Sequence, residues 1–264
     1  MIIVRHSYGL IKCNHFVLFP TFINFVLKIK LMKRIGLLLV FVGFFSASLF
    51  AEGTAVWSLV SATKKINKNW NAYVEAELRS HPNFTGGMGY FSFAVGTNYN
   101  ICQYLSATAT YVLIDRNTNG KYTSDSYITD YWGLSHRFHV SLTGKVKFGD
   151  FSVSLRERWQ YTYRPERYVA QLEKDMLTLR EAALVKGNAK HLLRSRLQLG
   201  YGINSINLST YVSAELFSSE KLDYVWYTVG AEYKINSQHA LDLYYRYQDE
   251  PSLNIIGVGY KFKF

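Results

Sequence analysis

The end of the chain, residues 254–264, constrains the fold most, because apolar or aromatic side chains recur there at every second position. One face carries Ile256, Val258, Tyr260, Phe262 and Phe264, and the other carries Gly257, Gly259, Lys261 and Lys263. A period of two is that of a β-strand with one apolar side. Because a strand at a chain end leaves an edge that must be paired, we expect a closed sheet around it.

The segment 32–51 has the three parts of a secretory signal peptide. It begins with Lys33 and Arg34, continues with an apolar run over 35–45 and ends on Ala51 before Glu52. The apolar run is shorter than the roughly 20 residues of a membrane-spanning helix. We therefore expect cleavage after Ala51, with Ser48 as the alternative position.

Residues 1–31 precede this signal and are interpreted as an upstream extension, with translation beginning at Met32. The competing interpretation is that 1–51 forms one long anchor. The expected organisation is an extension (1–31), a signal peptide (32–51) and a β-barrel (52–264).

Removal of 1–51 also changes the charge. This segment holds six basic residues and no acidic ones, so the formal net charge falls from +11 to +5. The remaining Lys and Arg residues alternate with aromatics and do not cluster, which argues against a nucleic-acid partner. Cys13 lies in the segment removed, so Cys102 has no cysteine with which to pair within the mature chain.

The mature chain repeats apolar alternation in segments of 10–14 residues, separated by short and long polar connections in turn. This rhythm is typical of outer-membrane β-barrels, since only helices and closed barrels satisfy the backbone inside a bilayer. Candidate strands lie at 54–63, 70–80, 89–100, 104–115, 127–140, 150–163, 190–202, 206–217, 223–234, 239–249 and 254–264. Bacterial barrels normally have an even strand number, so we predict an all-β, antiparallel transmembrane barrel of ten to twelve strands, with twelve favoured.

The connections predict the sidedness. Turns at 65–69, 203–205 and 235–238 are short and are expected in the periplasm, whereas the connections at 81–88, 116–126, 164–189, 218–222 and 250–253 are expected outside. Within 164–189, apolar residues recur at spacings of three and four: Val169, Leu172, Met176, Leu179 and Ala183. That spacing predicts an amphipathic helix over 168–184.

Several short elements, in order, give the chain a family resemblance. They include Arg156 and Arg158, Arg194 and Arg196, the run 244–248 and the terminal aromatic strand. From about Trp57 to Phe264 the chain resembles the uncharacterised outer-membrane family known as domain of unknown function 2490. The resemblance implies a barrel in the bacterial outer membrane and implies no activity. Trp226 stands where a basic residue is expected in such sequences.

The terminal strand also resembles the signature by which outer-membrane barrels are recognised. The barrel-assembly machinery is therefore an expected partner, through Tyr260, Phe262 and Phe264, beside outer-membrane lipid.

If the apolar face meets lipid, the opposite face lines the lumen with charges of both signs. The expected lumen-lining residues are Glu75, Glu77, Arg79, Arg137, Arg156, Arg158, Arg194, Arg196, Glu215, Glu232, Asp242 and Arg246. Guanidinium groups make forked hydrogen bonds to carboxylates, so these charges could hold a narrow lumen closed. The alternative is a surplus of arginine for a small anionic solute.

No metal-ligand spacing, Gly-rich phosphate loop or other motif predicts a cofactor. The leading hypothesis is therefore a non-enzymatic narrow channel or structural membrane protein. One alternative is a lipid-modifying enzyme, because His136 and Glu157 both fall on the apolar face of neighbouring strands. The other is a surface-binding protein that uses the loop 164–189.

Overall fold

The computed structural model describes residues 54–82, 87–175, 178–219 and 222–264. The predicted extension and signal peptide lie outside these residues. Within the described part of the chain, no helix is long and apolar enough to cross a membrane.

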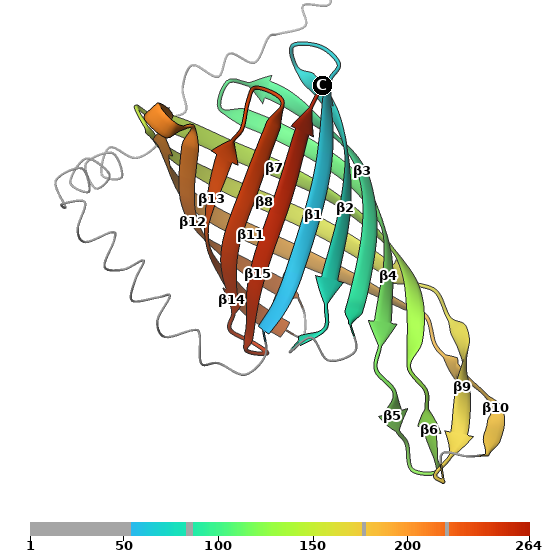
Figure 1. The fold of residues 1–264 in the computed structure, drawn as a ribbon. Helices are drawn as coiled ribbons and strands as arrows, with labels where there is room; N and C mark the ends of the chain where they lie inside the picture. Colours follow the sequence, from blue (N-terminus) through green and yellow to red (C-terminus); the bar gives the residue numbers. More distant parts are fainter. Residues whose placement is uncertain (1–53, 83–86, 176–177, 220–221) are drawn as a thin grey trace, which may run out of the picture. The chain divides into compact units, whose positions relative to one another are not determined.

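Eleven strands form a closed barrel (Figure 1). They are β1 (Thr54–Lys65), β2 (Trp70–Ser80), β3 (Met88–Cys102), β4 (Leu105–Thr118), β7 (Tyr131–Phe148), β8 (Phe151–Arg164), β11 (Asn188–Ile203), β12 (Leu208–Ser219), β13 (Leu222–Lys234), β14 (His239–Gln248) and β15 (Leu253–Lys263). Eleven lies within the predicted range, but the favoured number of twelve is wrong. The expected strand 127–140 was also too short, because β7 continues to Phe148 before the turn to β8.

A barrel with an odd number of strands can close only if two neighbouring strands are parallel. Neighbouring strands are antiparallel around the barrel, so the first and the last of eleven strands must run in the same direction. β1 accordingly pairs with β15 in parallel, from Thr54 opposite Asn254 to Thr63 opposite Lys263. The backbone N–H of Phe264 also donates to the carbonyl of Thr63 at 2.9 Å. The terminal strand thus has neighbours on both sides, and the barrel has no free edge.

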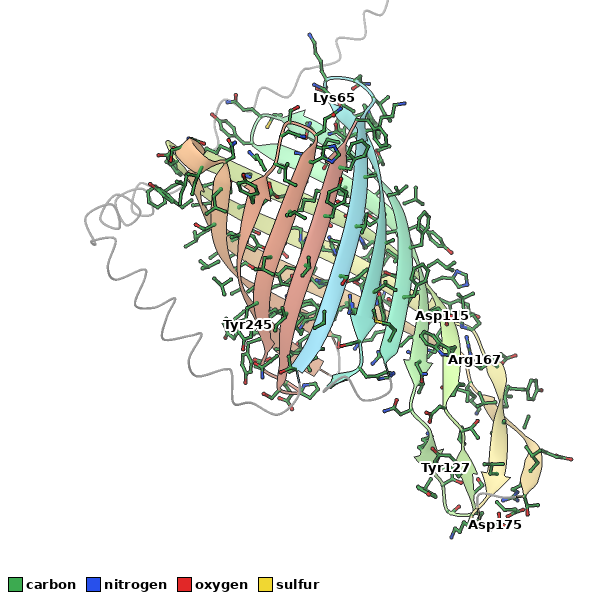
Figure 2. All side chains as sticks on the ribbon, in the orientation of Figure 1. Lys65, Asp115, Tyr127, Arg167, Asp175 and Tyr245 are labelled. Atoms are coloured by element: carbon green, nitrogen blue, oxygen red, sulfur yellow. The ribbon has the colours of Figure 1, made fainter. Side chains whose placement is uncertain are left out.

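The two ends of the barrel differ in their connections. The short-turn end carries the connections 66–69, 103–104, 149–150, 204–207 and 235–238, which include the short 3₁₀ helix η2 (Asn204–Ile206). The long-loop end carries the connections 81–87, 119–130, 165–187, 220–221 and 249–252. The three turns predicted to be short therefore share one end. Figure 2 shows Lys65 at that end.

The long connections hold a second sheet beyond the long-loop end of β4 and β7. This extension consists of β5 (Lys121–Tyr122), β6 (Ser126–Ile128), β9 (Arg167–Glu173) and β10 (Leu179–Val185), in the order β10-β9-β6-β5. Figure 2 shows Tyr127 and Asp175 in it. Arg167 attaches β9 to the barrel, because its Nη1 and Nη2 donate to the carbonyls of Trp132 at 2.6 Å and Leu134 at 2.9 Å.

The predicted helix over 168–184 is wrong, since this segment contains β9 and β10. The two strands form a hairpin in which Leu172 lies opposite Leu179 and Val169 opposite Ala183. Met176 lies outside the described residues. The spacing that resembled a helical stripe thus comes from apolar pairs placed almost symmetrically about the hairpin turn.

The outer wall of the barrel is apolar, as the alternation predicts. Large exposed side chains follow every second position, for example Leu78 on β2, Phe91 and Phe93 on β3 and Val258 on β15. In water such a surface would be unfavourable, whereas hydrocarbon is its natural environment. The intervening side chains point into the barrel and form the interior described next.

Candidate functional site

The barrel encloses a cavity of about 720 Å³ to which all eleven strands contribute. Ten basic and six acidic side chains line it, so its wall has a formal excess of positive charge. Turn residues of the short-turn end, including Gly149, Asp150 and Asn204, are part of the lining, and no described residue in the connections of the long-loop end contributes. The cavity therefore extends to the short-turn end.

The residues that the sequence assigned to the lumen gather around this cavity. Its lining includes Glu75, Glu77, Arg79, Arg137, Arg158, Arg194, Arg196, Glu215, Glu232, Asp242 and Arg246. Arg156 is not part of the lining, but its Nη2 lies 2.6 Å from Oε1 of Glu215 and so faces the same interior.

Four arginines occupy adjacent positions on β8 and β11. The strand register places Arg158 opposite Arg194 and Arg156 opposite Arg196. Like charges in directly opposed positions repel each other. Glu215 on β12 relieves part of this repulsion, because its Oε1 accepts from Arg156 Nη2 at 2.6 Å and from Arg194 Nε at 2.9 Å. The side chains of Arg156, Arg194 and Glu215 retain only 13, 12 and 6% exposure, so these charges lie largely away from solvent.

Other lumen arginines bond to hydroxyl groups of directly opposed residues. Arg158 Nε donates to Ser141 Oγ at 3.0 Å, and Arg246 Nε donates to Thr228 Oγ1 at 3.0 Å. Arg137 Nε donates likewise to Thr162 at 3.2 Å. A hydroxyl fixes the orientation of a guanidinium but contributes no negative charge. The Nε contacts therefore orient these three side chains without neutralising them.

Apolar and aromatic side chains fill the lumen toward the long-loop end. We call this group the aromatic seal; its buried members are Ala55, Trp57, Leu192, Phe217, Trp226 and Ile255. Phe217 is 2% exposed and its ring centroid lies 4.3 Å from that of Trp226. A second buried cluster, Tyr90, Ala94, Val112 and Ile114, lies on β3 and β4. Each seal residue is close to the long-loop end of its strand, and Trp57 and Trp226 also line the cavity.

Arginines cover the inner side of the seal. The guanidinium carbon of Arg79 lies 3.8 Å from the ring centroid of Trp57, and that of Arg246 lies 4.6 Å from Trp226. Arg194 lies 4.3 Å from Phe217. Such cation–π contacts stabilise a charge against an aromatic face. Trp226 stands where a basic residue was expected, and its ring contacts the guanidinium groups of Arg194 on β11 and Arg246 on β14.

The acidic residues near the short-turn end are mostly paired. Lys261 Nζ lies 2.7 Å from Glu232 and 3.2 Å from Asp242, while Asp150 accepts from Asn204 at 3.0 Å. Lys145, Lys147 and Lys234 line the cavity at the same end. These lysines give the open end of the cavity a positive charge.

Sequence reasoning missed several lining residues, among them His139, Lys145 and Gln160. His139 is buried and contributes to the cavity wall, as does Gln160. The signal was available, because His139 follows Arg137 by two positions and so shares its face. A rule based on charged residues alone does not detect neutral polar groups. No group of three or more potential metal ligands occurs among the described residues.

The pair proposed for a lipid-modifying enzyme does not come together. His136 is opposite Tyr163, whereas Glu157 is six positions earlier on β8 and opposite Leu142. At about 3.3 Å per residue, this is a separation of about 20 Å along the strand. His136 Nδ1 contacts the hydroxyl of Tyr111 at 2.7 Å, and Glu157 accepts from Ser195 at 2.6 Å. A base and its orienting group would need hydrogen-bond contact.

The side chains expected to mark the chain for assembly lie at the short-turn end of β15. His239 Nδ1 contacts the hydroxyl of Tyr260 at 2.5 Å, and the rings of Phe262 and Phe264 meet edge to face with centroids 4.4 Å apart. Phe264 is 66% exposed.

The solved structures that are similar to this chain include two autotransporter domains of low sequence identity. The β-domain of the Bordetella autotransporter Brka has a TM-score of 0.47 and 14% identity, with 73% of this chain and 80% of that chain covered. The translocator domain of the autotransporter NalP from Neisseria meningitidis has a TM-score of 0.44 and 14% identity, with 70% of each chain covered.

No curated protein matches the sequence. Residues 54–254, which include the ten barrel strands from β1 to β14 and the first two residues of β15, match the family described as "Protein of unknown function (DUF2490)". This match spans well over half of the chain and agrees with the resemblance seen in the sequence. The chain therefore belongs to the DUF2490 family.

Proposed function

We propose that the protein is a non-enzymatic β-barrel of the bacterial outer membrane that holds small anions in an arginine-rich lumen and does not conduct them. The observation that carries this proposal is the position of the cavity. It reaches the short-turn end with an excess of basic side chains and ends against the aromatic seal.

The apolar outer wall and the alternation of short and long connections support the membrane location. In bacterial outer-membrane barrels the short turns face the periplasm and the longer loops face outward. On this orientation the cavity opens toward the periplasm. The C-terminal Tyr260, Phe262 and Phe264 would be presented on the same side, where the assembly machinery would recognise them.

The sealed lumen favours a binding or structural role over a channel. The interior of a narrow barrel is easily filled by its own side chains. The residues that line the lumen determine which solutes can enter it. Ion flow would require a continuous polar path. The packed rings of Trp57, Phe217 and Trp226 would interrupt that path.

A planar-bilayer recording of the purified full chain tests this proposal. The wild-type protein is expected to give no steady current, although it shows the heat-dependent gel mobility of a folded barrel. The double variant Trp57→Ala/Trp226→Ala removes two rings of the seal and is expected to give anion-selective steps. Steady steps from the wild-type protein would overturn the sealed lumen, whether or not the double variant folds.

A further inference from the structure

The arginines of β8 and β11 carry more positive charge than their surroundings neutralise. From this excess we infer a binding site for the phosphate group of a small soluble molecule, in which Arg158 and Arg196 contact the phosphate. The inference rests on the proposed function, because the ligand would enter through the open short-turn end.

The charge count shows the excess. Arg156, Arg158, Arg194 and Arg196 contribute four positive charges, and Glu215 contributes one negative charge among them. Glu75 lines the same cavity from β2 and has no ion pair among the described contacts. Even if Glu75 is counted, two positive charges remain without a counter-charge. Buried or half-buried charges are costly unless they are paired, so a bound anion would stabilise this cluster.

The contacts show which arginines are available. Arg156 and Arg194 are both held by Oε1 of Glu215. Arg158 donates through Nε to the neutral hydroxyl of Ser141. Arg196 has a buried Nε without a hydrogen-bond partner. Among the described residues, no carboxylate forms an ion pair with Arg158 or Arg196.

The register brings these two arginines within reach of one ligand. Arg158 faces Arg194 and Arg196 faces Arg156, so Arg158 and Arg196 occupy diagonal positions on paired strands. Diagonal Cα atoms on neighbouring strands are about 7–8 Å apart, a separation that long side chains bridge. Two guanidinium groups can therefore converge on one oxyanion.

A phosphate monoester fits this arrangement better than a carboxylate. It carries a charge of about −1.5 to −2 at neutral pH and three acceptor oxygens, which match two arginine forks. A carboxylate has one charge and two oxygens. The cavity of about 720 Å³ also falls in the size range of small-molecule sites, so it has room for an organic group beyond the phosphate.

The position of the site favours a soluble ligand over a membrane lipid. The closed ring of strands separates the interior from hydrocarbon on every side. Entry from the short-turn end passes the lysines Lys145, Lys147 and Lys234, which attract anions from the aqueous phase.

The direct test is titration of the full chain in nonionic micelles with inorganic phosphate, at constant ionic strength set by sodium chloride. Binding is followed by calorimetry and by tryptophan fluorescence, since Trp226 lies 5.4 Å from the guanidinium carbon of Arg194. We expect saturable binding of phosphate. Arg158→Gln and Arg196→Gln should each weaken it by about tenfold, because each removes a charge-assisted contact.

Arg180→Gln is the matched control, because Arg180 lies in the extension and forms an exposed pair with Glu173. It removes the same charge and should leave phosphate binding unchanged. Ser141→Ala keeps every charge but releases Arg158, and it should weaken binding by a smaller factor. This second variant keeps the test decisive if an arginine variant fails to fold. Wild-type affinity in both arginine variants, or equal weakening by Arg180→Gln, would overturn the site.

Vesicles that contain phosphatidic acid separate the two sources of phosphate. They should not compete with inorganic phosphate, and competition would overturn the assignment to a soluble ligand. The bilayer recording distinguishes this inference from the proposed function. A barrel that gives no current and does not bind phosphate would support the sealed lumen and refute the phosphate site. A barrel that conducts ions and binds phosphate would refute the sealed lumen and support the phosphate site.

Discussion

The two ends of the lumen are built from the same alternating strands but differ in their inward side chains. Toward the long-loop end, inward positions hold Trp57, Phe217, Trp226 and Ile255, and the interior is packed like the core of a soluble protein. Toward the short-turn end, inward positions hold charged and polar groups around a cavity. Strand geometry is common to both ends, so the identity of the inward side chains alone makes one end apolar and packed and the other charged and hollow.

The strongest test of this difference is to remove a ring from the seal. Phe217→Ala should lower the free energy of unfolding by about 3–5 kcal/mol, because it leaves a void among packed rings. Phe93→Ala is the matched control, since Phe93 is 46% exposed on the outer wall, where lipid or detergent chains can fill the space. Urea unfolding in micelles measures both. Equal losses would show that the seal is not packed more tightly than the wall.

The next test addresses the charged end. Glu215→Gln leaves Arg156 and Arg194 without their shared carboxylate and should destabilise the barrel by about 3 kcal/mol. Glu173→Gln breaks the exposed pair with Arg180 in the extension and should cost below about 1 kcal/mol. Addition of phosphate should recover part of the loss in Glu215→Gln if an anion can replace the carboxylate. If this variant is as stable as the wild-type protein, the four arginines of β8 and β11 do not need the carboxylate of Glu215.

The smallest expected effect concerns packing between the two ends. A Cβ atom at Gly257 would overlap the ring of Tyr244, whereas one at Gly144 would meet only the carbonyl of Leu155 at 4.0 Å. Gly257→Ala should therefore cost about 1–3 kcal/mol by overpacking, and Gly144→Ala should have little effect. Thermal unfolding monitored by gel mobility compares them. A tolerated Gly257→Ala would mean that Tyr244 can move, and that the inner side of the seal is less rigid than its buried rings indicate.

The positions of the barrel strands and the direction in which their side chains point were predictable, because both depend on the alternation of residues within a single strand. One side of a transmembrane strand meets hydrocarbon and the other does not, so alternation in Phe91, Phe93 and Val95 is sufficient to assign it. The placement of Arg137, Arg158 and Arg246 on the inward side follows from the same period. These predictions needed no knowledge of which strands are neighbours.

The extension was not predictable from periodicity. Val169, Leu172, Leu179 and Ala183 fit a helical stripe and also fit a hairpin with apolar cross-strand pairs. The two arrangements differ in long-range partners, such as the pairing of β9 with β6 at Tyr127 and Leu172. Those contacts join residues more than forty positions apart, and local spacing does not encode them.

The sequence by itself determined that the chain forms a barrel wall, which side chains face inward and that the interior is rich in charge. Only the tertiary structure decided that eleven strands close through a parallel β1–β15 pair, that Glu215 is shared by two arginines, and that the aromatic residues gather at one end. The physical reason is that alternation is a property of one strand, whereas closure, charge pairing and the seal depend on the register between strands distant in the sequence.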